Sequence, residues 1–119
     1  MQPANIDLTI YKGSTFSKSF QWKTGNPAVP VDLTTCSLKM QVRRNVNDTV
    51  VLSEFSSENG MLVITDGLLG KIELNIPADI SAAFSFSAGV FDIEVTFIGT
   101  GDTYRIIEGC FSAVPEVTK

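Results

Sequence analysis

The sequence contains no histidine and two cysteines, Cys36 and Cys110. Without histidine, the chain cannot supply a Ser-His-Asp or Cys-His catalytic group, a histidine-bound zinc site or a histidine-ligated haem. Two cysteines are also too few for a four-thiolate metal site within one chain. We therefore expect no cofactor and no metal centre, and we expect the protein not to be an enzyme.

Positive charge is scarce, because nine Lys and Arg side chains stand against thirteen Asp and Glu side chains, a net charge of −4. Nucleic-acid-binding and polybasic membrane-surface proteins usually present a basic field, which this composition does not supply. No apolar run approaches the roughly 20 residues that a membrane-spanning helix needs, and residues 1–7 lack the features of a secretory signal. We expect folding in a reducing cytoplasm, without nucleic-acid binding or membrane insertion.

Length and composition predict one globular domain over residues 1–119. The 119 residues are 44% hydrophobic and 18% charged, which is close to an ordinary globular domain. A chain of this length can bury a sizeable core, so it needs no disulfide or metal to fold.

Apolar and polar residues alternate along most of the chain, which is typical of strands with one buried and one exposed face. The pattern is clear over residues 6–10, 38–43, 72–76 and 91–97. Over residues 16–22 it is interrupted by Lys18. These segments predict strands whose apolar residues face a common core.

The last predicted strand, residues 104–114, does not alternate cleanly. Ile106 and Ile107 are adjacent and Gly109 lies mid-strand, so we expect a bulge near Gly109. A tight turn at residues 58–60 and a hairpin turn with two glycines at residues 99–102 separate neighbouring strands. Several short strands at near-regular spacing predict an all-β, immunoglobulin-like antiparallel β-sandwich.

Residues 78–86 break the alternation and are rich in Ala and Ser. Pro77 precedes this segment, and Asp79 is placed to cap a helical turn. We predict one short helical connection here, with Phe84 and Phe86 covering one end of the core.

The two cysteines allow two interpretations. Cys36 shares the parity of Leu38 and Met40, so we expect it to point inward, and Cys110 lies in the last predicted strand. The pair could form a cross-sheet disulfide. It could equally be two buried reduced thiols, which the expected cytoplasmic environment favours.

Acidic and aromatic side chains give two further candidate sites. Asp92 and Glu94 share the polar face of one strand, with Glu108 opposite across a hairpin. Paired carboxylates can perform acid–base chemistry, but we favour a solvated sheet face, because such acids also deter edge-to-edge pairing. Tyr11, Trp22 and Tyr104 could form a sugar-binding platform, although the parity of Trp22 favours the core.

Three stretches carry a resemblance to a known family. They are residues 7–16 with Phe20-Gln21-Trp22, residues 25–34 with 38–43, and residues 89–95 with 106–109 and 114–118. The chain resembles small virion proteins of tailed phages and prophages, and is similar to the N-terminal immunoglobulin-like domain of baseplate upper proteins in phages of Gram-positive bacteria. Cys36 and Cys110 depart from that pattern.

The resemblance implies a non-enzymatic virion structural protein that is made and folded in the host bacterial cytoplasm. We expect a tail, baseplate or neck component, or an adaptor that attaches host-recognition parts, with other virion proteins as partners and self-association into a ring or trimer as an option. A capsid decoration protein and a carbohydrate-binding module remain alternatives. Partner contacts are expected at strand edges. The candidate edge residues are Ile6, Leu8, Ile10, Phe111, Val114 and Val117.

Overall fold

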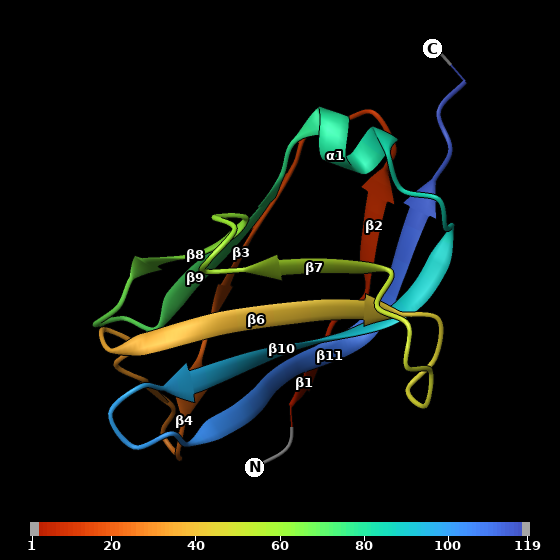
Figure 1. Cartoon of the computed structure of the whole chain (residues 1–119). Helices are drawn as coiled ribbons and strands as arrows, with labels where there is room; N and C mark the ends of the chain where they lie inside the picture. Colours follow the sequence, from red (N-terminus) through yellow and green to blue (C-terminus); the bar gives the residue numbers. More distant parts are fainter. Residues whose placement is uncertain (1–2, 118–119) are drawn as a thin grey trace.

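The computed structural model describes residues 3–117 and contains two β-sheets that pack face to face (Figure 1). The strands of the six-stranded sheet are β1 (Ala4–Asn5), β2 (Leu8–Tyr11), β6 (Cys36–Arg43), β7 (Ser53–Ser56), β10 (Ala88–Phe97) and β11 (Thr103–Val114). The strands of the three-stranded sheet are β3 (Phe16–Gln21), β8 (Leu62–Asp66) and β9 (Lys71–Ile76). The remaining elements are a small hairpin of β4 (Lys23–Thr24) and β5 (Val29–Pro30), and the helix α1 (Ala78–Ala82).

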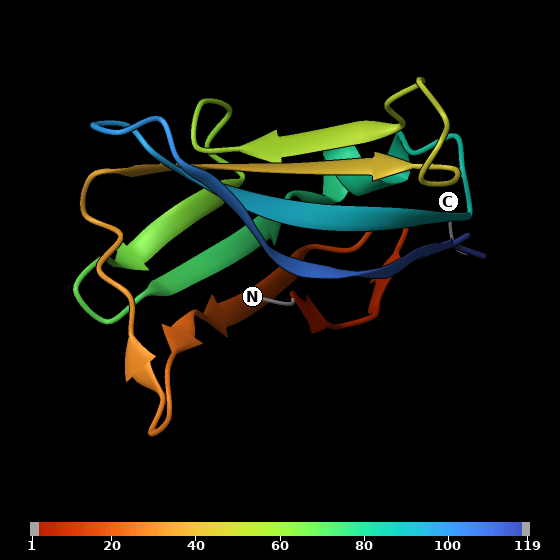
Figure 2. The ribbon, with the colours of Figure 1, turned by 90° about the horizontal axis from the view of Figure 1, so that it is seen from below.

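The order of the larger sheet is β1, β11, β10, β6, β7, with β2 also paired to β11, and that of the smaller sheet is β3, β9, β8. All pairings are antiparallel except those of β1 and β2, which run parallel to β11. The predicted all-β, immunoglobulin-like sandwich is confirmed. The β4–β5 hairpin projects from the body of the sandwich (Figure 2).

The core lies between the two sheets and follows the predicted alternation. In β10, Phe91, Ile93 and Val95 are buried, while Asp92 and Glu94 are partly exposed on the opposite face. The same inward series occurs in β6 and β9, and together they form one continuous buried cluster. Full burial of one such side chain contributes about 1.5–3 kcal/mol, so the sheet–sheet contact stabilises the fold.

The predicted helical connection is confirmed as α1, which covers five residues of the expected segment. Pro77 occupies the N-cap and no side chain caps the helix, so the predicted cap by Asp79 is wrong. The helix is held instead by buried Ser81, whose Oγ accepts a hydrogen bond from Gly13 N (3.0 Å) and donates one to Ser14 O (2.9 Å). Within residues 3–117, no helix has the length and apolar character needed to cross a membrane.

Phe84 and Phe86 follow α1 and cover one end of the core, as predicted. The ring of Phe84 lies 5.1 Å from that of Phe86 and 6.0 Å from that of Phe111. Phe55 joins the same group, stacked 6.3 Å from Phe111. The segment between α1 and β10 is therefore anchored by aromatic packing.

The predicted bulge exists but lies at Ile106 and not near Gly109. Ile93 pairs with Ile107 and Glu94 with Arg105, so Ile106 is the extra residue of β11. A bulge lets two successive side chains turn inward, which explains why Ile106 and Ile107 are both buried. Gly109 pairs regularly, and its role is steric, because a Cβ there would overlap the carbonyl oxygen of Ile6.

The structure contradicts the disulfide interpretation of Cys36 and Cys110. Cys36 is paired with Phe97 and Cys110 with Val90 across β10. A strand rises about 3.3 Å per residue, so the register separates the two cysteines by on the order of 20 Å, whereas disulfide Cα atoms lie about 4.4–6.8 Å apart. Both are free thiols, Cys36 half-buried and Cys110 exposed, so the alternative of two buried thiols fails for Cys110.

Candidate interaction site

The predicted N-terminal edge is an outer margin of the larger sheet. β1 and β2 pair with β11 on one side, and no strand of residues 3–117 pairs with their other side. Leu8 and Ile10 are buried in the core, and Ile6, between the two strands, is half-buried. The accessible part of this edge is therefore its backbone.

The predicted C-terminal edge is wrong over residues 111–114. Phe111 and Val114 belong to β11, which lies between β10 and β2 and so has both sides paired. Alternation reports which face of a strand is buried but not which strands flank it, and for that reason it could not exclude an edge here. Val117 lies beyond β11 and is 98% exposed.

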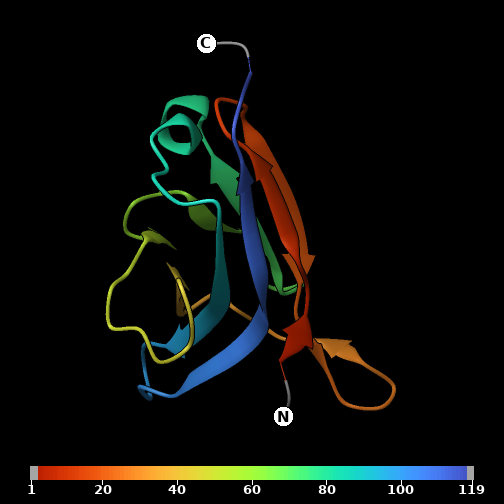
Figure 3. The same cartoon turned by 90° about the vertical axis from the view of Figure 1, so that its right-hand side faces the viewer.

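A second free edge belongs to β3, which alternation did not single out. β3 pairs with β9 alone among the strands of residues 3–117. On the opposite side of the sandwich, residues 57–61 join β7 of the larger sheet to β8 of the smaller sheet. At the end of this turn, Met61 O accepts a hydrogen bond from Asn75 N (2.7 Å). On the other side of the sandwich, residues 12–15 join β2 to β3 (Figure 3). Within residues 3–117, no strand pairing connects β3 with β1 or β2, so this side is open to a further strand.

This open side forms a groove of about 750 Å³. We call it the β3 groove. Its lining residues come from the N-terminal segment, from β3 and β4 with the residues that follow, and from β11. They are Ala4, Ile6, Lys18, Ser19, Phe20, Gln21, Trp22, Lys23, Thr24, Gly25, Ile106 and Ile107.

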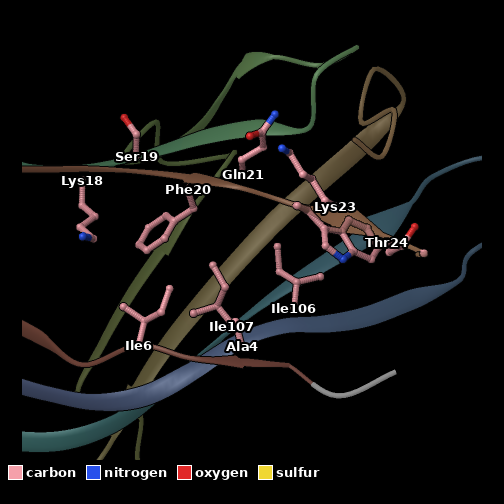
Figure 4. Close-up of a pocket in the computed structure, with 12 residues that line it drawn as sticks. Ala4, Ile6, Lys18, Ser19, Phe20, Gln21, Lys23, Thr24, Ile106 and Ile107 are labelled. Carbon is pink, nitrogen blue, oxygen red and sulfur yellow. The ribbon is translucent and has the colours of Figure 1, made fainter. Parts of the chain in front are cut away.

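The floor of the β3 groove is apolar. Phe20 points from β3 toward Ile6, while Ile106 and Ile107 rise from β11 beneath it (Figure 4). The β11 bulge places both isoleucines there, since without it one of them would face the other side of the sheet. The lining is therefore built from segments far apart in the sequence.

The rim of the β3 groove is basic. Lys18 and Lys23 line it and are exposed, and no lining residue is acidic. Within residues 3–117, neither lysine forms an ion pair with an Asp or Glu. Lys18 has the inward parity of Phe16 and Phe20, and it points to the groove side of β3 (Figure 4). An inward-pointing charge is a common feature of edge strands, and this was the sequence signal that could have located the groove.

The backbone of β3 offers a row of hydrogen-bonding groups at the same edge. Trp22 N donates to Gly70 O (2.9 Å), and the register pairs Phe20 with Ile72. In an antiparallel ladder, alternate residues direct N–H and C=O toward the same neighbour. The backbone groups of Ser17, Ser19 and Gln21 therefore point away from β9, along the free edge.

The acidic candidates lie on the outer face of the larger sheet, away from the β3 groove. Asp92 is directly opposite Glu108, as predicted. Arg105 joins them, with Nε 3.2 Å from Asp92 Oδ2 and a guanidinium nitrogen 3.5 Å from Glu108 Oε1. These side chains are partly exposed, so the arrangement is a solvated ion-pair cluster. Within residues 3–117, no three Cys, Asp or Glu side chains gather closely enough to hold a metal ion.

The aromatic candidates do not form one platform. Trp22 is buried, as predicted, and packs 5.9 Å from Tyr104 and 6.3 Å from Phe97. Tyr104 is partly exposed, while Tyr11 is exposed at the opposite end of β11, where it pairs with Val114. A sugar-binding surface would therefore lack the indole face of Trp22.

Exposed apolar side chains occur in the turns at the end of the sandwich that carries the β4–β5 hairpin (Figure 2). Leu68 and Leu69 form the β8–β9 turn, and Gln21 of the groove donates from Nε2 to Leu69 O (2.8 Å). Val29 lies in the hairpin and Ile98 in the β10–β11 turn. Sequence patterning missed these residues because turns carry no periodic signal.

Two ionisable groups near this end have shifted pKa values. The backbone N–H of Thr34 donates to Asp32 Oδ1 (2.9 Å) and lowers the pKa of that carboxyl. Burial raises the pKa of the Cys36 thiol, and the charge of Asp32 raises it further. A raised pKa lowers the thiolate fraction of Cys36 at a given pH, which makes this thiol less reactive as a nucleophile.

Comparison with known proteins finds likeness at the level of the fold. No family model matches the sequence, and no curated protein does. Among solved structures, the chain is similar to the N-terminal domain of phage TP901-1 ORF48, with a TM-score of 0.51 and 13% sequence identity. The match covers 97% of this chain and 90% of that one. The protein therefore has the fold of a domain found in a phage protein.

Proposed function

We propose that this protein is a non-enzymatic structural component of a tailed-phage virion. It is located in the tail, baseplate or neck and attaches other virion parts, including host-recognition parts, through protein–protein contacts. The observation that carries the proposal is the likeness to the N-terminal domain of phage TP901-1 ORF48 over 97% of this chain. The resemblance to baseplate upper proteins points the same way. It is carried by residues 7–16 with 20–22, residues 25–34 with 38–43, and residues 89–95 with 106–109 and 114–118.

The surface supports an interaction role. The sheet margins at β2 and β3 are among those that have no further strand paired to them within residues 3–117, and backbone groups at such edges bind extended segments of other chains. The exposed Leu68 and Leu69 add apolar area that a partner can cover. The candidate carboxylates, by contrast, are held by Arg105 in a solvated cluster.

The test is fractionation of purified virions of the encoding phage into heads and tails, with quantitative mass spectrometry of this polypeptide. We expect it in the tail fraction at low copy number. Recovery with heads in hundreds of copies would replace the proposal with capsid decoration. Absence from both fractions would refute the virion role, and a glycan-binding screen would then test the carbohydrate-binding alternative.

A further inference from the structure

We propose that the β3 groove binds an extended, acidic and apolar segment of another virion protein, which adds to the free edge of β3 as a fourth strand of the β3–β9–β8 sheet. This inference rests on the proposed function, because it assigns the surface and the class of partner for the attachment. Its support comes from the edge, the floor and the rim of the groove.

The edge supplies the hydrogen bonds. Ser17, Ser19 and Gln21 direct backbone N–H and C=O groups away from β9, and no strand of residues 3–117 receives them. The side chains of Ser17 and Ser19 bond to Asn75 Oδ1 (2.7 Å) and Glu73 Oε2 (3.3 Å) on β9. They therefore lie over the sheet and leave the edge open to an incoming strand.

The floor supplies apolar contact. A strand beside β3 directs alternate side chains inward, over Ile6 and Phe20. We therefore expect apolar residues at every second position of the partner segment.

The rim supplies the charge preference. Lys18 and Lys23 lie on either side of Phe20 along the chain, with Lys18 pointing to the side of Phe20 and Lys23 to the side of Gln21 (Figure 4). Neither lysine has an acidic neighbour among the residues that line the groove. They are five positions apart in an extended chain, a span of about 16 Å. An incoming segment with acidic residues at a similar spacing pairs with both. This local basic rim contrasts with the net charge of −4 of the whole chain.

The same charges disfavour a second copy of this chain as the occupant. Antiparallel pairing of two β3 strands would bring Lys18 and Lys23 of both copies to one seam. Like charges placed together across an interface cost binding energy. A different chain with acidic residues meets no such penalty.

The experiment uses a phage that lacks this gene and is complemented with variants of the full chain. The paired change Lys18→Asp with Lys23→Asp reverses the rim charge. Ser19→Pro removes an N–H that points to the free edge and leaves the donors of the β9 ladder intact. The matched control is Lys71→Asp, an exposed lysine on the neighbouring strand β9 that does not line the groove.

Incorporation into the tail fraction is the readout, and thermal unfolding of each purified variant verifies the fold. We expect the charge-reversed variant to lose at least about tenfold in incorporation, with the Ser19→Pro variant also reduced and the Lys71→Asp variant at the wild-type level. Wild-type incorporation of folded, charge-reversed protein would overturn the inference and leave the proposed function standing. Failure of the wild-type chain to enter tails would refute the proposed function itself.

Discussion

Ile93 lies in the middle of β10, between β6 and β11, and is fully buried. Replacing it with alanine leaves a cavity where the two sheets meet. We predict that Ile93→Ala lowers the free energy of unfolding by about 2–5 kcal/mol. Urea denaturation followed by tryptophan fluorescence measures this, because Trp22 is buried in the same core.

Lys39→Ala is the matched control. Lys39 is exposed on β6 and lies opposite Glu94, the residue that follows Ile93 in the sequence. Its effect should stay within about 0.5 kcal/mol. A loss of similarly small size for Ile93→Ala would contradict the inward position of that side chain.

The two thiols should differ in reactivity. Cys110 is exposed, whereas Cys36 is half-buried and has a raised pKa because of burial and the nearby Asp32 charge. We predict that a thiol reagent labels Cys110 first in the folded protein. A raised pKa means less thiolate at a given pH, so labelling of Cys36 should keep accelerating as the pH rises above the ordinary thiol range.

Single Cys→Ser variants assign the two rates, and unfolding in denaturant provides the control in which both thiols react freely. Gel mobility and thermal stability should not change with reductant. Equal native rates, or a reductant-sensitive mobility, would contradict the placement of the two cysteines.

At the scale of elements, Gly109 allows the N-terminal segment to lie against β11. A Cβ at this position would overlap the carbonyl oxygen of Ile6, whereas a Cβ at Gly99, in the β10–β11 turn, would meet nothing within 4 Å. We predict that Gly109→Ala destabilises the fold by about 1–3 kcal/mol through overpacking, and that Gly99→Ala is close to neutral. Hydrogen exchange should show the loss of protection concentrated in β1 and β2.

Similar stability of the two alanine variants would show that the N-terminal segment does not rest on Gly109. Unchanged protection of β2 in a destabilised Gly109→Ala variant would place the strain elsewhere in β11.

Alternation predicted the strands that carry several inward residues, such as β6, β9 and β10. It missed β7, because Ser53–Ser56 contains a single large apolar residue, Phe55, and so has no readable period. It misplaced the β11 bulge because Gly109 offered a local signal, whereas the register that defines the bulge depends on pairing with β10. The helix cap failed because Pro77, and not Asp79, occupies the N-cap.

At the scale of the whole molecule, the candidate site could not be read from any one segment. The β3 groove joins Ile6, Phe20 and Ile106, which only the folded sheets bring together. Lys18 carried the one local signal, as a charge at an apolar position of an edge strand. The predicted C-terminal edge failed for the same reason, since sequence patterns do not reveal which strands flank β11.

Charge is distributed unevenly over the surface of the molecule, which the net charge alone does not reveal. The chain is acidic overall, yet the groove is rimmed by Lys18 and Lys23. On the outer face of the larger sheet, Arg105 is already joined to Asp92 and Glu108. Lys18 and Lys23 at the β3 groove therefore remain available to an acidic partner, whereas Arg105 is already paired.

Photo-cross-linking within intact virions identifies the chain that lies against the β3 groove. A photo-reactive residue replaces Lys18 in one variant and Lys71 in another, and mass spectrometry identifies the cross-linked peptides. We predict that position 18 cross-links to an extended, acidic segment of another tail protein and that position 71 does not. A cross-link from position 18 to a head protein, to a second copy of this chain, or to nothing in virions that contain the protein would contradict it.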